Sequence, residues 1–317
     1  MKIVFLDRET VGHDIDTTKF REFGELVEYD TTNRDQVKEY IKDANVIIFN
    51  KTVMNEDMLV NAKELKLICV TATGFDNIDL DYCRKNKIAC CNVVGYSTPS
   101  VVQHTFASTL YILEKLDYYD KFVKSEEYAN QSSFTNFSKT FYELEGKTWG
   151  IIGMGNIGKK VAEVARTFGA NVITHSITNK DNKDYKNVSF DDLLNQSDIL
   201  SLHCPLSDLS RNLINLEALK KMKSNAILVN VARGPVVNDA DLYYALENNL
   251  IYGAALDVLT NEPMAKDNPL INFKDSNRLL ITPHIAWASY ESRSRCLSEI
   301  YENIHSFIKG DRRNRLD

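Results

Sequence analysis

The stretch WGIIGMGNIGKKVAEVARTFGANVIT, residues 149–174, decides the fold, because its pattern changes in turn from strand to glycine-rich turn, helix and strand. Its first residues are apolar, as in a buried strand. A helical spacing of apolar residues follows over 157–168, and Gly169 ends it just before a second apolar run. The order strand, helix, strand predicts two parallel strands joined by a crossover helix.

Three glycines in this stretch, Gly153, Gly155 and Gly158, have the spacing G-x-G-x-x-G. In this context Gly153 permits a tight turn, Gly155 lets a pyrophosphate approach the backbone, and Gly158 lets helix and strand pack closely. Asn156 and Ile157 open the helix, whose first N–H groups and partial positive charge favour an anion. We therefore expect a dinucleotide site; the alternative is a glycine turn without a ligand.

One part of the dinucleotide pattern is missing at the end of the following strand. About 20 residues beyond the glycines, an Asp or Glu normally binds the ribose hydroxyls of NAD. This chain has His175 and Ser176 there, in the sequence NVITHSITNK. Ser176 does not repel a 2′-phosphate, and Lys180 follows closely. NAD is the expected cofactor, with NADP left open.

The bulk composition narrows the function classes. A chain of 317 residues is long enough for two domains, and its 44% hydrophobic and 26% charged residues are ordinary for a globular enzyme. The net charge of −6 argues against nucleic acid or an anionic membrane as a partner. The start, MKIVFLDRET, is too short in apolar residues for a signal peptide, and no apolar run approaches a membrane span.

The cysteines indicate a reducing compartment. No two of them form a CxxC pair, and several lie inside apolar, strand-like runs, so we expect reduced buried thiols in a cytoplasmic protein. No His, Cys or Asp cluster has the spacing of metal ligands, so no metal is expected. The six cysteines are Cys69, Cys83, Cys90, Cys91, Cys204 and Cys296.

Strand-like and helix-like segments alternate through most of the chain, which predicts parallel sheets covered by helices. The fold class is therefore α/β, with two doubly wound parallel-sheet domains of the Rossmann or flavodoxin type and a cleft between them. A second alternating series runs over 149–284. The expected helices are 16–23, 33–42, 55–62, 79–86, one long helix over 98–123, and 290–308, with a surface loop over 132–147.

Three strand ends in the second series carry side chains that act together in one kind of chemistry. The segment 278–287, RLLITPHIAW, stops at a proline and then presents His284. Two other strands end at Arg233 and at Asp257, and Glu262 follows the latter. Because parallel sheets bind ligands beyond the carboxyl ends of their strands, these groups should meet at the edge that holds the dinucleotide. An arginine, a carboxylate and a histidine there suit the reduction of a 2-oxo acid. Taken singly, each is most simply a surface ion pair, a turn or a structural histidine.

Several segments resemble successive signatures of the D-isomer-specific 2-hydroxyacid dehydrogenases, over essentially the whole chain. They are VTATGFDNIDL, SVVQHTFAS, GIIGMGNIG, LSLHCPLSDLSRNLIN, LVNVARGPVVNDADL, GAALDVLTNEP and ITPHIAWAS. The details of the last two are most similar to the glycerate dehydrogenase, or hydroxypyruvate reductase, branch. This resemblance implies a substrate-binding domain, 1–98 plus 288–317, around an inserted dinucleotide-binding domain, 99–287. It also implies a homodimer formed through the helix and loop after Pro99.

The resemblance also implies roles for the site residues. His284 matches the proton donor, Glu262 its partner, and Arg233 the arginine that binds the substrate. Asp257 matches a residue near the nicotinamide carboxamide. The turn Ala72, Thr73, Gly74 and Phe75 matches the loop whose N–H groups hold the substrate carboxylate. The remaining expected cofactor contacts are Thr105, His203, Cys204, Pro205, Val231, Ala232 and Trp287, with Arg233, Asp257 and His284 shared.

The expected reaction is hydride transfer between the nicotinamide and a small 2-oxo acid, with hydroxypyruvate and D-glycerate as the favoured pair and glyoxylate possible. Glu262 would favour the imidazolium form of His284. Two alternatives remain: a non-catalytic NAD(H)-sensing regulator on the same fold, and a related D-lactate-type or phosphite dehydrogenase. Formate enzymes are disfavoured, because the similar enzymes that oxidise formate have glutamine in the place of Glu262.

Overall fold

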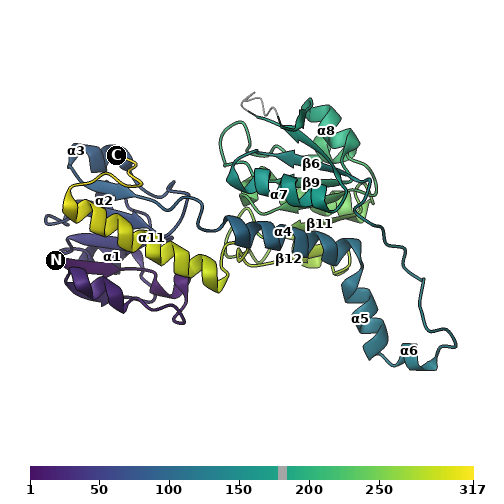
Figure 1. Ribbon diagram of the computed structural model, residues 1–317, viewed down its shortest axis with the longest axis horizontal. Helices are drawn as coiled ribbons and strands as arrows, with labels where there is room; N and C mark the ends of the chain where they lie inside the picture. Colours follow the sequence, from purple (N-terminus) through teal and green to yellow (C-terminus); the bar gives the residue numbers. More distant parts are fainter. Residues whose placement is uncertain (178–183) are drawn as a thin grey trace. The chain divides into compact units, whose positions relative to one another are not determined.

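The computed structural model describes residues 1–177 and 184–317, so Lys180 lies outside the described residues (Figure 1). The chain divides into two compact units. Unit 1 consists of Met1–Ser97 and Ala288–Asp317, and unit 2 is Thr98–Trp287. Each unit contains a parallel sheet with helices packed on it, which confirms the expected α/β class.

The sheet of unit 1 has five parallel strands in the order β2-β1-β3-β4-β5. The three central strands are almost continuously apolar and buried, as expected for a parallel sheet covered on both faces. The strands are β1 (Lys2–Phe5), β2 (Glu25–Glu28), β3 (Val46–Phe49), β4 (Leu67–Val70) and β5 (Ala89–Cys91).

Helices pack on the sheet of unit 1. Apolar side chains of α1, α2 and α3 form one buried cluster with the sheet, and α11, from the end of the chain, contacts β4 and η2. Figure 1 shows α11 lying across this sheet. The helices are η1 (Arg8–Val11), η2 (Thr18–Phe23), α1 (Arg34–Tyr40), α2 (Glu56–Leu59), α3 (Leu80–Lys85) and α11 (Tyr290–Lys309).

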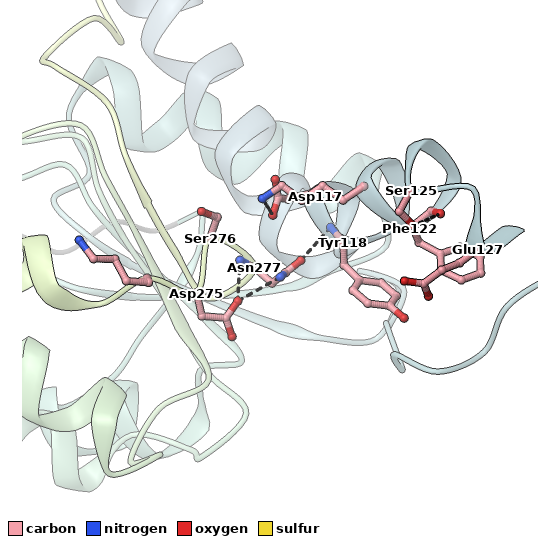
Figure 2. A pocket seen from close by; sticks show the side chains of 10 residues that line it. Asp117, Tyr118, Phe122, Ser125, Glu127, Asp275, Ser276 and Asn277 are labelled. Atoms are coloured by element: carbon pink, nitrogen blue, oxygen red, sulfur yellow. Dashed lines mark hydrogen bonds and ion pairs between the residues drawn. The ribbon is translucent and has the colours of Figure 1, made fainter.

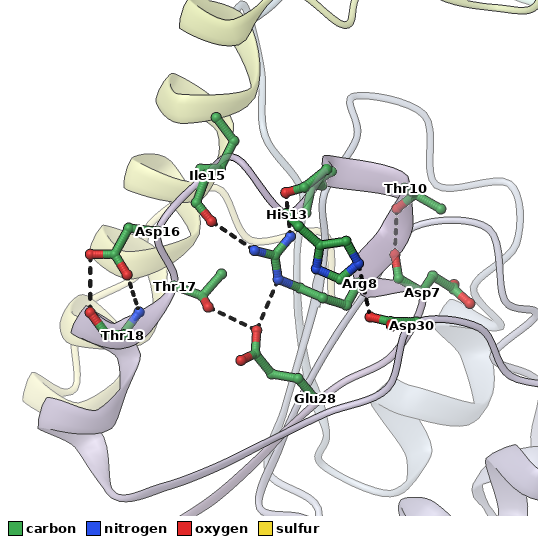
Figure 3. A network of polar contacts seen from close by, with 12 residues as sticks. Asp7, Arg8, Thr10, His13, Ile15, Asp16, Thr17, Thr18, Glu28 and Asp30 are labelled. Carbon is green, nitrogen blue, oxygen red and sulfur yellow. Dashed lines mark hydrogen bonds and ion pairs between the residues drawn. The ribbon is translucent and has the colours of Figure 1, made fainter.

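The expected helix 16–23 is wrong in type, because only a 3-10 helix, η2, forms there. The reason lies in a polar network that fixes the residues before it (Figure 3). Buried Arg8 donates to the carbonyl of Ile15 at 2.7 Å, and Thr17 donates to Glu28 at 2.8 Å. These bonds hold the chain outside a helix up to Thr17, so the helical stretch begins only at Thr18 and ends at Phe23, before Gly24 with a φ of 142°.

The sheet of unit 2 has, in the described part of the chain, seven strands in the order β12-β11-β10-β9-β6-β7-β8, all parallel. The chain order reverses between β6 and β9, which is where doubly wound sheets bind ligands. The strands are β6 (Thr148–Ile152), β7 (Asn171–His175), β8 (Lys186–Asn187), β9 (Ile199–Leu202), β10 (Ile227–Asn230), β11 (Gly253–Leu256) and β12 (Leu279–Ile281).

Two sets of helices cover the two faces of this sheet. Side chains of α4 and α7 share one buried cluster with the sheet, and those of α8, α9 and α10 share the other. The helices are α4 (Thr98–Leu113), α5 (Leu116–Lys124), α6 (Glu127–Asn130), α7 (Asn156–Thr167), α8 (Phe190–Gln196), α9 (Leu216–Lys221), η3 (Gly234–Val236), α10 (Asp239–Glu247) and η4 (Pro269–Asn272).

The expected single helix 98–123 is wrong, because the chain breaks between α4 and α5. Lys115 adopts a left-handed conformation with a φ of 59°. Its ammonium group lies 3.5 Å from the centre of the Tyr252 ring, a cation–π contact. A tertiary contact thus overrides the helical pattern. The chain from α5 to β6, residues 116–147, is called the arm; it extends away from the rest of unit 2 and returns to the core at Leu144 (Figure 1).

Candidate active site

The glycine-rich loop of unit 2 has the geometry of a dinucleotide cradle. Gly153 has a φ of +95°, and a Cβ there would lie 2.6 Å from the backbone nitrogen of Cys204. A Cβ on Gly158 would lie 2.0 Å from the carbonyl oxygen of Gly153, so α7 approaches the loop too closely for any side chain. A Cβ on Gly155, in contrast, would meet nothing within 4 Å. Gly155 therefore faces open space, where a pyrophosphate fits.

Where the strand order reverses between β6 and β9, several polar groups have no partner among the described residues and are available to a ligand. The backbone N–H groups of Met154, Gly155 and Asn156 donate to no acceptor in the described residues; Gly155 caps α7, and Asn156 is its first residue. His203 follows β9, and its buried Nδ1 has no hydrogen-bond partner among the described residues. Its Nε2 lies 3.0 Å from Ser201 Oγ, which accepts from Trp149 Nε1. Burial lowers the pKa of His203 to about 3, so its ring is neutral at ordinary pH.

The end of β7 carries no acid, as the sequence indicated. His175 is the last residue of the strand, and its Nδ1 lies 3.1 Å from the carbonyl oxygen of Val188. Ser176 follows, half-buried. In the described part of this strand end, 175–177, no carboxylate would therefore repel a 2′-phosphate. Lys180 lies outside the described residues and adds nothing here.

Arg233 follows β10 in extended conformation and precedes η3. Its guanidinium forms one hydrogen bond, to the carbonyl of Ala232 at 2.8 Å, and no ion pair with a described carboxylate. Gly234 explains the position of this turn, since a Cβ there would lie 1.8 Å from the carbonyl oxygen of Leu259. The Arg233 turn is thus pressed against the turn that carries Glu262.

Asp257, at the end of β11, holds the loop that follows β12. Its side chain is 1% exposed. One oxygen accepts from Thr282 Oγ1 at 2.6 Å and from Ile285 N–H at 2.8 Å, and the other accepts from Ala286 N–H at 2.8 Å. Both carboxylate oxygens are therefore committed to the loop 282–286. Its expected role beside the nicotinamide carboxamide stays a prediction.

His284 sits in that loop with a φ of +55°, a left-handed conformation that costs free energy for a non-glycine residue. Its N–H donates to the carbonyl of Asp257 at 2.8 Å, and its Nδ1 lies 2.7 Å from Glu262 Oε2. The other oxygen of Glu262 accepts from Leu259 N–H at 3.1 Å. The carboxylate orients the ring, so that an Nδ1–H donates to it and Nε2 is left for chemistry.

The turn 72–75 lies in unit 1, beyond the carboxyl end of β4. The backbone N–H groups of Thr73, Gly74 and Phe75 donate to no acceptor in the described residues. Side-chain bonds nevertheless fix the turn: Thr73 Oγ1 donates to the carbonyl of Val93 at 2.8 Å, and Asn92 donates to the carbonyl of Thr73 at 2.8 Å. A rigid turn with unused N–H groups suits a carboxylate.

The remaining expected cofactor residues differ in exposure. Cys204 and Ala232 are buried, Val231 and Trp287 are half-buried, and Pro205 is exposed. Thr105 is fully buried in α4, where its hydroxyl donates to the carbonyl of Val101 at 2.7 Å, so its hydroxyl hydrogen is already used.

Sequence reasoning missed two members of the His284 loop support. Thr282 bonds to Asp257, and His104 Nε2 lies 3.1 Å from Thr282 Oγ1. The signal for Thr282 was its place beside Pro283 at the strand end. His104 gave no signal, because its partner Thr282 lies 178 residues away in the sequence.

A pocket of about 280 Å³ lies elsewhere in unit 2, between α5, α6 and the loop before β12 (Figure 2). Tyr118 N–H donates to Asn277 Oδ1 there at 2.9 Å. The pocket is at the amino end of β12, away from the strand ends described above. It contains none of the expected site residues.

Among residues 1–177 and 184–317, no group of three or more His, Cys, Asp or Glu side chains is placed to hold a metal ion. The absence of a metal stays a prediction. None of the helices in these ranges combines the length and apolar character that a membrane span needs.

Comparison with known proteins agrees with this geometry. The sequence profile of the D-isomer specific 2-hydroxyacid dehydrogenase NAD binding domain matches residues 106–286, more than half of the chain. The chain belongs to this family. A nicotinamide cofactor and a small-molecule substrate follow from membership. The resemblance to this family that the sequence indicated is confirmed.

Individual members of the D-2-hydroxyacid dehydrogenase family are similar along their whole length. The chain is 33% identical to the hydroxypyruvate reductase of Blautia hydrogenotrophica over 98% of both chains. It is 34% identical to the glycerate dehydrogenase of Methylorubrum extorquens, over 99% of this chain and 98% of that one. The D-lactate dehydrogenase of Aquifex aeolicus, solved with NAD and lactic acid, has a TM-score of 0.85 at 31% identity, covering 98% and 96%.

Proposed function

We propose that the protein is a D-2-hydroxyacid dehydrogenase that reduces a small 2-oxo acid, with hydroxypyruvate and D-glycerate as its substrate pair. The observation that carries the proposal is the 2.7 Å contact between His284 Nδ1 and Glu262 Oε2, in a loop that buried Asp257 holds. The similarity to a hydroxypyruvate reductase and a glycerate dehydrogenase supports the choice of substrate. Unit 1 is proposed as the substrate-binding domain and unit 2 as the dinucleotide-binding domain.

The residues of the chain bind and orient the substrate. The N–H groups of Thr73, Gly74 and Phe75 bind its carboxylate, as unpaired backbone donors do for anions. Arg233, whose guanidinium has no ion pair among the described residues, binds the 2-oxo acid through its planar fork of donors. It also stabilises the negative charge that develops on the ketone oxygen.

His284 moves the proton. The Glu262 carboxylate accepts from Nδ1–H and stabilises the imidazolium, so the proton at Nε2 is directed to the developing alkoxide. When bound, the reduced nicotinamide supplies the hydride. In the reverse direction, Nε2 removes the hydroxyl proton of the D-2-hydroxy acid.

A panel of 2-oxo acids with NADH and NADPH tests the proposal. We expect turnover of hydroxypyruvate, and His284→Asn should lower kcat by roughly 10²- to 10⁴-fold, the contribution of a positioned acid. Asparagine is chosen because it tolerates left-handed backbone. His305→Asn, on α11, is the matched control and should keep its activity. Absence of turnover on the whole panel would favour the non-catalytic NAD(H)-sensing regulator, and preference for pyruvate would favour a D-lactate-type enzyme.

We propose NAD as the cofactor, with NADP also accepted. The reason is that Ser176 at the end of β7 offers no negative charge against a 2′-phosphate. Ser176→Asp should therefore raise the preference for NADH, measured as the ratio of kcat/KM for NADH and NADPH. An unchanged ratio would contradict this assignment.

We also propose a homodimer formed through the arm. Two aromatic side chains of the arm, Phe134 and Phe137, are 89% and 84% exposed in the single chain. Highly exposed aromatic side chains only three residues apart in the sequence are typical of an interface. A Phe134→Asp, Phe137→Asp double variant should sediment as a monomer. Leu209→Asp, at a 64% exposed position outside the arm, is the control and should leave the dimer intact.

The six cysteines are all free thiols and all buried in the structure. This supports the proposal that the enzyme works in a reducing compartment, the cytoplasm.

A further inference from the structure

A second loop lies beside the turn 72–75 at the carboxyl edge of the unit 1 sheet. Residues 50–53 follow β3, whose last residue, Phe49, pairs with Val70 of the adjacent β4. The side chain of Asn77 joins the two loops, because it donates to the carbonyls of Asn50 at 2.9 Å and Thr52 at 3.0 Å. The loop 50–53 is therefore a fixed neighbour of the N–H groups proposed to bind the carboxylate.

A buried charge holds this loop in place. Asp7, 8% exposed and left-handed with a φ of 55°, follows β1. Its Oδ2 accepts from the N–H groups of Lys51 at 3.1 Å and Thr52 at 3.0 Å, and from Thr52 Oγ1 at 2.7 Å. Burying a carboxylate and straining its backbone both cost free energy. Such an arrangement is typical of a preorganised site rather than of an ordinary surface loop.

Lys51 is the cation that this loop carries. Its side chain is exposed, and its ammonium group has no ion pair or hydrogen bond in the described residues. Arg8, which follows Asp7 in the sequence, is buried and donates to Glu28 and to two carbonyls, so it is not available to a ligand. Asp76, on the neighbouring turn, is exposed and forms no ion pair with Lys51.

We infer that Lys51 determines substrate specificity by reading the group on C3 of the 2-oxo acid, and that the enzyme prefers a hydroxyl or carboxylate there to hydrogen or alkyl. The inference rests on the proposed function and deepens it. With the C1 carboxylate on the turn 72–75 and the C2 ketone oxygen assigned to Arg233 and His284, the group on C3 is the polar part of a three- or four-carbon substrate that still lacks a partner. An ammonium group donates to a hydroxyl and pairs with a carboxylate, but gains nothing from a methyl group.

The test compares hydroxypyruvate, 2-oxosuccinate and pyruvate as substrates of the full-length enzyme. Lys51→Met keeps the length of the side chain and removes its charge, and Lys51→Glu reverses the charge. The control is Lys63→Met, an exposed lysine at the amino edge of the same sheet. We expect Lys51→Met to lower the kcat/KM ratio of hydroxypyruvate to pyruvate roughly tenfold, the loss of one charge-assisted hydrogen bond. Lys51→Glu should lower the ratio of 2-oxosuccinate to pyruvate further, and Lys63→Met should change neither.

The outcomes separate the two proposals. A wild-type enzyme that turns over none of the three acids with NADH or NADPH overturns the proposed function. An active wild type whose ratios are the same in Lys51→Met and Lys63→Met overturns the assignment of Lys51 alone. A fall in kcat/KM that is equal for all three acids also overturns it, because such a fall indicates binding of the shared carboxylate.

Discussion

Replacing Asp257 by asparagine is expected to loosen the loop that presents His284. The carboxylate accepts three hydrogen bonds, from Thr282, Ile285 and Ala286, and its side chain is 1% exposed. An amide of the same shape keeps one oxygen but turns an NH₂ group toward a donor. At least one N–H of the loop, or the Thr282 hydroxyl, then loses its acceptor.

The magnitude follows from the individual bonds. A hydrogen bond to a charged group contributes about 1.5–3 kcal/mol, and a neutral one about 0.5–1.5 kcal/mol, so each retained bond weakens by about 1 kcal/mol. The bond that is lost leaves unsatisfied donors, which costs about 1–3 kcal/mol. An amide is easier to bury than a carboxylate, which offsets part of the sum. We expect a net loss of about 2 kcal/mol in the free energy of unfolding.

Urea unfolding of the cofactor-free protein, followed by fluorescence, measures this loss without any contribution from cofactor binding. Trp287 lies next to the loop and reports on it. Asp241→Asn, in α10, is the matched control, since that carboxylate accepts one backbone N–H, from Leu216 at 2.9 Å, and none from the loop 282–286. It should cost about 1 kcal/mol. If the free energy of unfolding of Asp257→Asn were within about 0.5 kcal/mol of that of the wild type, the proposal that Asp257 holds the loop 282–286 would be refuted.

Three further predictions follow from single residues. Gly155→Ala should keep wild-type stability but weaken NADH binding at least roughly tenfold in calorimetry, because its Cβ would occupy only the open space where a pyrophosphate fits. Gly153→Ala should weaken binding and also lower the melting temperature, because Gly153 has a φ of +95° and the new Cβ would lie 2.6 Å from the backbone nitrogen of Cys204. Equal behaviour of the two variants would contradict the proposed dinucleotide cradle. Burial lowers the pKa of Lys115 from its ordinary 10.5 to about 8. Between pH 8 and pH 10.5 the unfolded chain therefore binds more protons than the folded one, and the free energy of unfolding should rise with pH over this range. Lys115→Met should lack this rise in urea titrations. Burial likewise lowers the pKa of His203 to about 3, so stability should fall as pH drops below about 6.5, and His203→Asn should show a smaller fall between pH 7 and pH 4.5.

The sequence predicted the features that local pattern controls. The series of strands, α7 with its glycines, and α11 appear close to their expected bounds, because buried parallel strands and an amphipathic helix each have a distinct apolar period. His284 and Glu262 could be placed at one sheet edge in advance, because both follow strands of the same parallel sheet. Their pairing was implied by the resemblance to the dehydrogenase family.

Other features depend on contacts between residues distant in the chain, and no local pattern reports them. The break at Lys115 is set by the ring of Tyr252, and the short η2 by the bonds of Arg8 and Glu28. The commitment of both Asp257 oxygens to the loop 282–286 was equally hidden, because a buried acid at a strand end has the same sequence whether it meets a ligand or the backbone.

The division of unit 1 into two stretches of chain has a consequence for synthesis on the ribosome. Its strands leave the exit tunnel first, but α11, which covers β4, follows only after the whole of Thr98–Trp287 has been translated. At about 5–20 residues per second, the nascent sheet waits on the order of ten to forty seconds with one apolar face uncovered. Unit 1 is thus begun first and completed last. During translation its uncovered apolar face is the surface that a chaperone would bind.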